Sequence, residues 1–388
     1  MPDGSETQVI KVIGAIDEIK AADWDACAGS DDPFVSHAFL FALEHSGSVS
    51  AEAGWLPQHL VLEDENSVAL AVVPLYLKNN SYGEYVFDWG WADAYHRAGG
   101  QYYPKLQAAV PFSPVTGRRL LVRPDLSPEK QRALQMALLS GLVQLAERLK
   151  VSSFHMTFAS QAEWQLCGEM GMLQRTDRQF HWLNDDFDCF DDFLAALSSR
   201  KRKDIRKERR AVDAGDTVIH SLSGDQIEPR HWDAFYSFYR DTSDRKWGQA
   251  YLNRGFFTRL AETMADNVLL VMAEQDGRFV GGALNMIGGD TLYGRYWGCL
   301  ENFKFLHFEV CYYRAIEYAI EKKLKRVEAG AQGEHKLKRG YLPHPTYSAH
   351  WIADPGFRDA VARFLVAETA AVHDDIDALS DHSPFKSS

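Results

Sequence analysis

The spacing of apolar and polar residues predicts the same order of elements in both halves of the chain. In the first half, two apolar runs flank the polar residues 64–66, which is the pattern of a hairpin. Further on, Ser127 and Pro128 precede a long apolar pattern at helical spacing, and this pair is typical of a helix start. The elements expected in the first half are strands at 59–63, 68–77 and 83–91, a helix that begins after Ser127, and a buried strand at 152–158.

The second half repeats this order around a stronger turn signal. Asp276 and Gly277 separate two apolar runs, and this dipeptide is favoured in the tight turns of hairpins. The elements expected in the second half are strands at 267–274, 280–287 and 290–298, a helix at 306–324, and a strand at 326–329.

A three-stranded meander, a crossover helix and a further strand together form a mixed α/β layer. The length of 388 residues suits two domains better than one core. The strand-like run 178–183 gives way to an acidic turn at 184–186, which is where we place the boundary. The sequence therefore predicts an α/β fold with mixed sheets, with an N-terminal domain at 1–184 and a C-terminal domain at 185–388.

Composition and charge narrow the class of protein. The formal net charge of −12 argues against a protein that coats nucleic acid, because neutralising phosphates needs a basic surface. The N-terminal residues lack the pattern of a secretory signal, and no apolar run reaches the roughly 18 residues of a membrane span. The five cysteines include no CxxC pair, which is typical of reduced thiols. We therefore expect a cytoplasmic protein with no membrane span.

A dense cluster of positive charge stands out against this acidic background. The helical pattern at 190–214 carries eight Lys or Arg residues between positions 200 and 210. Such a cluster is typical of an anion-binding surface, which would suit tRNA or a nucleotide-linked acceptor. The alternative is a solvated helix face without a ligand. The candidate anion-binding residues are Arg200, Arg202, Lys203 and Arg206.

Several longer strings resemble those of one protein family. They are SSRKRK (198–203), RKWG (245–248), YGRYWG (293–298) and EAGAQGEHK (328–336) in the second half, and PLYLK (74–78), EYVFDW (84–89) and PFSPVTG (111–117) in the first. These strings resemble the FemAB-like predicted N-acyltransferases of bacteria, in the GNAT superfamily. The resemblance implies two GNAT-like domains in tandem and transfer of an acyl or aminoacyl group onto an amine. In the wider Fem group the donor is aminoacyl-tRNA and the acceptor is a peptidoglycan precursor.

The segment 328–341 is the strongest candidate for the catalytic site, because it gathers polar side chains around three glycines after a short apolar strand. Acyl transfer to an amine needs a base for the ammonium proton and a donor for the developing oxyanion. Glu334 or His335 is the candidate base, while a cationic side chain or a backbone N–H stabilises the oxyanion or holds an anionic substrate. The alternative is a solvated polar loop. The candidate substrate-binding residues of this segment are Glu328, Gln332, Lys336 and Arg339.

A second candidate segment covers residues 295–309. In GNAT enzymes the loop before the corresponding helix binds the pyrophosphate of coenzyme A through backbone N–H groups and is rich in glycine. Here Glu301 and Glu309 bring negative charge instead, which counts against a conventional acetyl-CoA site. Tyr296 is a candidate acid toward the leaving group, and Glu309 is a candidate catalytic residue that faces the amine. Arg295 and His307 are candidate substrate-binding residues.

A third candidate lies between two helical patterns, in the string RKWG. Arg245, Lys246 and Trp247 are candidates to clamp a carboxylate or phosphate, with the indole ring as a wall. The alternative is a packed tryptophan with exposed cations beside it.

These residues leave three functions open. No GxxxxGKS, GxGxxG or GxSxG string occurs, which argues against nucleotide hydrolysis, Rossmann cofactors and α/β-hydrolase chemistry. The first function is a transferase with aminoacyl-tRNA or acyl-CoA as donor and an amine-bearing small molecule or peptide as acceptor. The second is an acyl-CoA-dependent N-acetyltransferase, and the third is a non-catalytic module that binds phosphorylated precursors or RNA. We expect no metal and no tightly bound cofactor.

Overall fold

The computed structural model describes residues 9–247, 250–301, 303–330 and 333–386, with the side chains of Lys246, Trp247 and Glu334 outside that description. Contacts divide the chain into two compact units. The first is made of Met1–Asp177 and Thr346–Val372, and the second of Arg178–Pro345 and His373–Ser388. Each unit therefore joins two stretches of chain. The domain ranges 1–184 and 185–388 stay a prediction.

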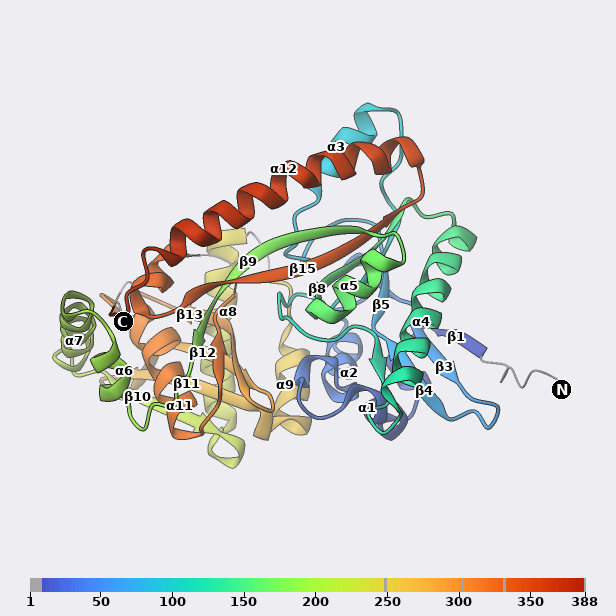
Figure 1. Cartoon of the computed structure of the whole chain (residues 1–388). Helices are drawn as coiled ribbons and strands as arrows, with labels where there is room; N and C mark the ends of the chain where they lie inside the picture. Colours follow the sequence, from blue (N-terminus) through green and yellow to red (C-terminus); the bar gives the residue numbers. More distant parts are fainter. Residues whose placement is uncertain (1–8, 248–249, 302, 331–332, 387–388) are drawn as a thin grey trace. The chain divides into compact units, whose positions relative to one another are not determined.

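The first unit is built on antiparallel and parallel strand pairs (Figure 1). One sheet has the strand order β1-β3-β4-β7, and a second run of strands has the order β15-β8-β6-β5-β2. The elements are β1 (Val9–Ile13), α1 (Ala21–Ala28), α2 (His37–His45), β2 (Trp55–Pro57), β3 (His59–Glu63), β4 (Ala69–Val73), β5 (Leu75–Lys78), α3 (Trp89–Arg97), β6 (Lys105–Ala108), β7 (Leu121–Val122), α4 (Pro128–Leu149), β8 (Ser153–Ala159) and α5 (Gln161–Glu169), with parts of β9 (Leu173–Leu183), β15 (Leu342–Ile352) and α12 (Pro355–Ser380).

Two of the strands predicted in this unit differ from the observed ones. The predicted hairpin is confirmed for β3 and β4, but the expected strand at 68–77 is divided at Pro74, and its two parts join different sheets. Proline supplies no backbone N–H to a ladder, so a break at this position is expected. The strand predicted at 83–91 is wrong, because residues 89–97 form helix α3.

Helix α4 covers the core of the first unit. The side chain of Ser127 accepts a hydrogen bond from the backbone N–H of Lys130, and Pro128 occupies the first turn. This confirms the predicted helix start. Leu138 and Leu142 of the helix are fully buried in a cluster that includes residues of the strands beneath it. Burial of this apolar face stabilises the helix far more than its cap does.

The second unit is built on a mixed sheet with the strand order β10-β11-β12-β13-β14-β9. Strands β13 and β14 are parallel, and the other neighbouring strands are antiparallel. Asp276 and Gly277 both have positive φ, of 51° and 72°, in the turn between β11 and β12. The elements are α6 (Phe190–Ala196), α7 (Ser199–Asp213), β10 (Val218–Ser223), α8 (Pro229–Trp247), α9 (Arg254–Thr263), β11 (Val268–Gln275), β12 (Arg278–Ile287), β13 (Thr291–Cys299), α10 (Leu306–Phe308), a π-helix (Glu309–Tyr313), α11 (Arg314–Glu321), β14 (Arg326–Glu328) and a 3₁₀-helix (Glu334–Arg339).

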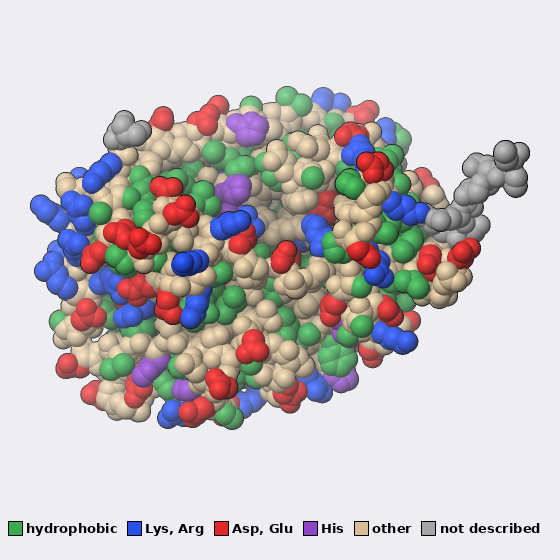
Figure 2. Space-filling view, turned by 60° about the horizontal axis from the view of Figure 1, so that its bottom comes forward, with side chains coloured by type: hydrophobic (Ala, Val, Ile, Leu, Met, Phe, Trp, Pro, Cys, Tyr) green, Lys and Arg blue, Asp and Glu red, His purple; other side chains and the backbone are tan. Residues whose placement is uncertain are grey.

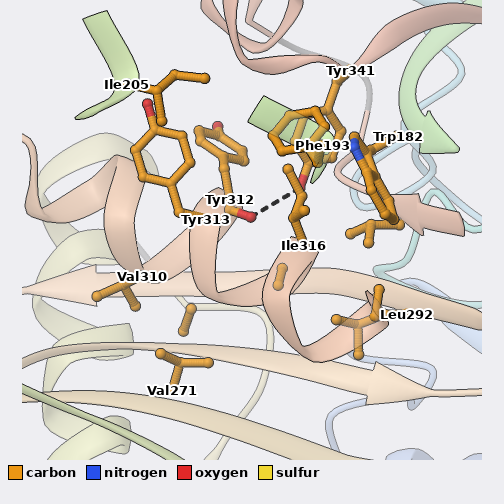
Figure 3. Packing of buried hydrophobic residues seen from close by; sticks show 14 of the residues in the cluster. Trp182, Phe193, Ile205, Val271, Leu292, Val310, Tyr312, Tyr313, Ile316 and Tyr341 are labelled. Atoms are coloured by element: carbon orange, nitrogen blue, oxygen red, sulfur yellow. Dashed lines mark hydrogen bonds between the residues drawn. The ribbon is translucent and has the colours of Figure 1, made fainter. Parts of the chain in front are cut away.

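Side chains from the sheet and the helices interdigitate in the core of the second unit. Figure 3 shows Val271 and Leu292 on the strands facing Val310 and Ile316 on the helical segment. Helix α8 packs against β12 and β13, and a Cβ atom added at Gly298 would lie 2.2 Å from the carbonyl oxygen of Phe238. A side chain at this glycine would therefore push α8 away from the sheet.

Two predicted helices of the second unit are interrupted. The pattern at 190–214 forms α6 and α7, because Leu197 and Ser198 have extended backbones. The helix predicted at 306–324 is present but contains the π-helical turn Glu309–Tyr313. Mixed sheets with helices packed on them confirm the predicted α/β fold class. Among the helices of the described residues, none combines the length and apolar character needed to cross a bilayer.

Candidate functional site

A cavity of about 430 Å³ lies in the second unit, at the point where β13 and β14 part. In the described chain the last pair between these two strands is Tyr293 with Glu328, whereas β13 continues to Cys299. Parallel strands that separate expose backbone and side chains beyond their last pair, which is where α/β proteins commonly place ligand sites. The cavity is lined by Ala283, Leu284, Asn285, Gly294, Arg295, Tyr296, Trp297, His307, Cys311, Tyr312, Ala329, Gly333, His335 and Lys336.

A β-bulge on β13 forms one wall of this cavity. Leu284 of β12 pairs with Tyr296, but the next residue, Asn285, pairs with Gly294. Arg295 is therefore the extra residue, and a bulge of this kind re-aims side chains without ending the strand. Both Arg295 and Tyr296 line the cavity as a result. The guanidinium carbon of Arg295 lies 5.3 Å from the centre of the Tyr296 ring.

The helical segment after β13 forms the second wall. The ring of His307 lies 5.3 Å from that of Trp297 and 5.3 Å from that of Tyr312, measured between centroids. Tyr312 belongs to the π-helical turn, a rare geometry that is often found at functional sites. Figure 3 shows Tyr312 beside Tyr313 and Tyr341, and the hydroxyl of Tyr341 donates to the carbonyl oxygen of Tyr312 at 3.5 Å.

The 3₁₀-helix after β14 forms the third wall. The Nε2 atom of His335 lies 2.9 Å from the hydroxyl of Tyr312. Gly333 has φ of +106°, and a Cβ atom there would lie 2.5 Å from Cε1 of His335. Only glycine fits this position, because other residues avoid the conformation and would collide with the imidazole. Burial, and then the cations Arg339 and Lys336, lower the pKa of His335.

Lys336 is the buried amine of this cavity, with a residue exposure of 4%. Its Nζ atom donates to the carbonyl oxygens of Ala329, at 2.5 Å, and Gly330, at 3.0 Å. Burial lowers the pKa of Lys336 to about 7, against an opposing contribution from Cys311 and together with one from Arg295. Burial therefore favours the neutral amine over the ammonium ion.

The described lining of the cavity includes five residues proposed from the sequence. Glu328 is buried in β14, 3.4 Å from Arg326 and 3.9 Å from His181. Gln332 lies outside the described residues, as does the side chain of Glu334, so their roles stay predictions. The five that line the cavity are Arg295, Tyr296, His307, His335 and Lys336.

Glu309 does not belong to the described lining of the cavity. Its carboxylate is 1% exposed and accepts hydrogen bonds from Arg209 at 2.9 and 3.1 Å. Arg314 approaches the same carboxylate to 2.8 Å. The prediction of a catalytic Glu309 that faces an amine is therefore corrected, since both oxygens face guanidinium groups. Its negative charge is also balanced, so it does not repel a phosphate as the sequence suggested.

Arg339 is likewise held by neighbours in the second unit. It forms an ion pair with Glu208 at 2.8 Å, and its guanidinium carbon lies 3.3 Å from the centre of the Phe308 ring. It also donates to the carbonyl oxygen of His335 at 2.7 Å. These contacts fix the 3₁₀-helix to α7 and so position His335.

The predicted Arg245 clamp borders a second cavity, of about 380 Å³. Arg245 donates to the carbonyl oxygen of Cys299 at 2.7 Å and pairs with Asp241 at 2.5 Å. Trp297 and His307 line both cavities, which makes the two spaces neighbours. The side chains of Lys246 and Trp247 lie outside the described part of the chain, so the full clamp stays a prediction.

The basic helix α7 presents its charge next to two further cavities. One, of about 390 Å³, shares His335 with the main cavity and is lined by Lys201, Lys207 and Lys338 among others. The other, of about 810 Å³, is lined by Lys203 and Arg206. Figure 2 shows Lys and Arg side chains gathered at its left edge, where Figure 1 draws α7. Of the predicted anion-binding residues, Arg200 and Lys203 are exposed, Arg202 is half-buried, and Arg206 pairs with Asp191 at 3.0 Å.

Sequence reasoning missed the part that Tyr312 and Cys311 play in the cavity wall. Both lie in a run that follows a helical pattern, so they were indistinguishable from core residues. The π-helical turn that aims them has no signal in residue spacing. Trp297 was present in the string at 293–298 but was not singled out.

Comparisons with known proteins agree on fold and family. The family model for FemAB-like proteins, described as peptidoglycan biosynthesis and recognition, matches residues 15–387. Comparison with curated protein sequences gave no match. Among solved structures, FemX is similar over 89% of this chain and 98% of its own, with 12% identity and a TM-score of 0.56.

Two further solved structures share the fold. The C-terminal domain of a putative lysylphosphatidylglycerol synthetase from Agrobacterium fabrum is similar over 88% of this chain and 95% of its own, with 10% identity and a TM-score of 0.54. L-PGS from Bacillus licheniformis is similar over 87% of this chain and 98% of its own, with 9% identity and a TM-score of 0.51. The predicted α/β fold with mixed sheets is shared with these solved structures.

Proposed function

This chain belongs to the FemAB-like family, and we propose that it transfers an acyl or aminoacyl group onto an amine in cell-envelope metabolism. The observation that carries the proposal is the cavity beyond the end of β14. There Arg295 and Tyr296, at the bulge of β13, line the same cavity as nitrogen bases from the helical segment after β13 and from the 3₁₀-helix after β14.

The cavity contains the groups that acyl transfer to an amine requires. The attacking amine must lose a proton, and the carbonyl oxygen must be stabilised as it becomes negative. His307, His335 and Lys336 supply nitrogen bases, while the guanidinium of Arg295 and the hydroxyl of Tyr296 supply donors. No carboxylate belongs to the described lining of the cavity. The polar groups that line the cavity therefore stabilise a transition state in which the carbonyl oxygen becomes negative.

Helix α7 favours a donor that carries phosphates. Arg200, Lys203 and Lys207 are exposed on this helix, and the cavity beside Lys203 has a volume of about 810 Å³. Several exposed cations along one helix suit an extended phosphate backbone better than one pyrophosphate group. We therefore favour aminoacyl-tRNA as the donor. The family description favours a peptide amine of a peptidoglycan precursor as the acceptor.

A transfer assay tests this function. The protein is incubated with bulk tRNA charged with radiolabelled amino acids and with a nucleotide-linked muramyl peptide, and label is followed into the peptide. We expect transfer by the wild type and a loss of roughly 10- to 1,000-fold in Arg295→Met, because one oxyanion donor is removed. Arg259→Met, which changes an exposed arginine of α9 paired with Glu262, is the matched control. Absence of transfer from every donor offered would remove the proposal.

Acyl-CoA is the second candidate donor. The balanced charge of Glu309 favours it, because one of the two carboxylates expected to repel a pyrophosphate is neutralised by Arg209 and Arg314. Acetyl-CoA and longer acyl-CoAs are titrated to millimolar concentration while the melting temperature is recorded. Binding to the native state raises this temperature, so an unchanged value would eliminate acyl-CoA.

A binding module without catalysis is the remaining candidate. Charge reversal of Arg202 and Arg206 is expected to weaken tRNA binding by roughly tenfold or more and to flatten its dependence on salt. If these variants lose tRNA binding and the wild type never transfers label, the protein binds RNA without transferring an acyl group.

A further inference from the structure

Lys336 is a buried amine in the wall of the main cavity. Its Nζ atom donates to two backbone carbonyls, of Ala329 and Gly330, and its residue lines the main cavity. An ammonium group has three N–H donors. Two point to the carbonyls, and the third position holds either an N–H bond or, in the neutral amine, a lone pair.

The charges around Lys336 come from several elements. Arg295 of β13 faces it, as do Cys311 of the π-helix and His181 of β9, while His335 belongs to the same 3₁₀-helix. In the described lining of the cavity no carboxylate accompanies these groups. A buried amine that has cationic neighbours and no acid releases its proton more readily than an exposed lysine does.

Two other candidate residues, Glu309 and His335, are less suited to this task, while the role of Glu334 stays a prediction because its side chain lies outside the described part of the chain. Glu309 is committed to Arg209 and Arg314. His335 has Nε2 against the hydroxyl of Tyr312, and Gly333 lies against the edge of its ring that carries Cε1 and Nδ1. His307 is the competing base and is therefore included in the test below.

We infer that neutral Lys336 is the general base that takes the proton from the attacking amine. This inference rests on the proposed function and names the base of the same cavity. It replaces the role of anion holder or oxyanion donor that the sequence suggested for Lys336.

The proposed step balances as follows. The lone pair of the acceptor nitrogen forms a bond to the carbonyl carbon, and the π pair of the carbonyl moves to its oxygen, beside Arg295 and Tyr296. The lone pair of Lys336 Nζ takes a proton from the positively charged nitrogen of this intermediate. When the carbonyl re-forms, the bond to the leaving oxygen or sulfur breaks, and that atom receives the proton from Lys336. The lysine is neutral again, and no further reactant is needed.

The titration of Lys336 tests the inference without a substrate. The native protein is labelled with trace acetic anhydride across a range of pH, and acetylation of each lysine is quantified by peptide mass spectrometry. Only the unprotonated amine reacts, and restricted access changes the amplitude of labelling but not its midpoint. We expect a midpoint near pH 7 for Lys336, far below that of Lys322, an exposed lysine of the same unit whose pKa its neighbour Glu321 raises. A midpoint close to that of Lys322 would overturn the inference.

A pH profile of transfer tests the role in catalysis. We expect Lys336→Met to lose roughly 100- to 10,000-fold in kcat and to lack the acidic limb of the profile. Lys336→Arg should fare no better, because its permanent charge cannot accept a proton, whereas Lys322→Met should match the wild type. Circular dichroism confirms that the variants are folded. An acidic limb that persists in Lys336→Met but disappears in His307→Gln would assign the base to His307 instead. If the wild type transfers nothing, the proposed function fails while the labelling midpoint still decides the state of Lys336.

Discussion

Both units of the molecule bury lysine side chains, and they handle the buried charge in opposite ways. In the first unit, Lys105 is fully buried and its ammonium donates to Glu84, at 2.7 Å, and to Asp88. In the second unit, Lys336 is buried against two backbone carbonyls, with no carboxylate in the described lining of its cavity. A buried charge with acidic partners can stay ionised, whereas one without them tends to lose its proton. Lys105 and Lys336 therefore differ in whether a carboxylate contacts the buried amine.

The network around Lys105 joins buried polar side chains of the first unit. Burial alone would lower its pKa, but the carboxylates of Glu84 and Asp88 raise the pKa of Lys105. The hydroxyl of Tyr102 donates to Asp88 at 2.7 Å. Lys78 lies 3.5 Å from the centre of the Trp55 ring, and burial lowers its pKa to about 7. These contacts join three strands and a loop that the sequence keeps far apart.

The largest expected effect on stability follows from removing Lys105, whose charge balances those of Glu84 and Asp88. Lys105→Met should lower the free energy of unfolding by about 3–5 kcal/mol, because it leaves buried carboxylates without their main partner. Urea denaturation followed by circular dichroism measures this loss. The matched control is Lys11→Met, which removes a surface ammonium 2.5 Å from Glu63 and should cost under about 1 kcal/mol. Equal losses of unfolding free energy in both variants would show that burial of the ion pair does not determine how much it stabilises the fold.

Glu309 of the second unit is a buried charge that, like the ammonium of Lys105, has partners of opposite charge. Glu309→Gln should cost about 2–3 kcal/mol, because Arg209 and Arg314 then face each other with less negative charge between them. Its kcat in the transfer assay should equal that of the wild type at a temperature where both are folded. Thermal unfolding and transfer are measured on the same preparation. A variant that is stable but inactive would return Glu309 to the list of catalytic residues.

Local patterns were sufficient to predict strands β11 to β14 of the second unit, whereas β10 was not predicted. The apolar runs around Asp276 and Gly277 predicted the β11–β12 hairpin within a few residues, because turn chemistry and alternation are properties of neighbouring residues. The run 83–91 failed for the opposite reason. Its aromatic residues are typical of a strand, but Glu84 and Asp88 are fixed by Lys105, a contact that spacing does not reveal.

The candidate site shows the same limit. Residue types and strings identified the groups that line the cavity, including Arg295, His335 and Lys336. They did not reveal that Arg209 neutralises Glu309 from 100 positions away, nor that two carbonyls hold the amine of Lys336. Residue types alone indicated which chemical groups the site contains. The protonation state and charge balance of these groups depend on contacts between residues that are distant in the sequence.

The last expected effect has the opposite sign and depends on pH. Burial lowers the pKa of Lys336 to about 7, below the value of about 10.4 that lysine has in an unfolded chain. Between these two values the unfolded chain binds a proton that the folded chain does not, so the stability of the wild type rises with pH across this window. Methionine removes this dependence. Lys336→Met should therefore be more stable than the wild type at pH 7 and below, and the difference should shrink toward zero near pH 10. Urea denaturation of both proteins at several pH values measures the difference. A variant that is less stable at pH 7, or a difference that does not change with pH, would mean that the two carbonyls hold Lys336 in its charged form, and the contrast with Lys105 would disappear.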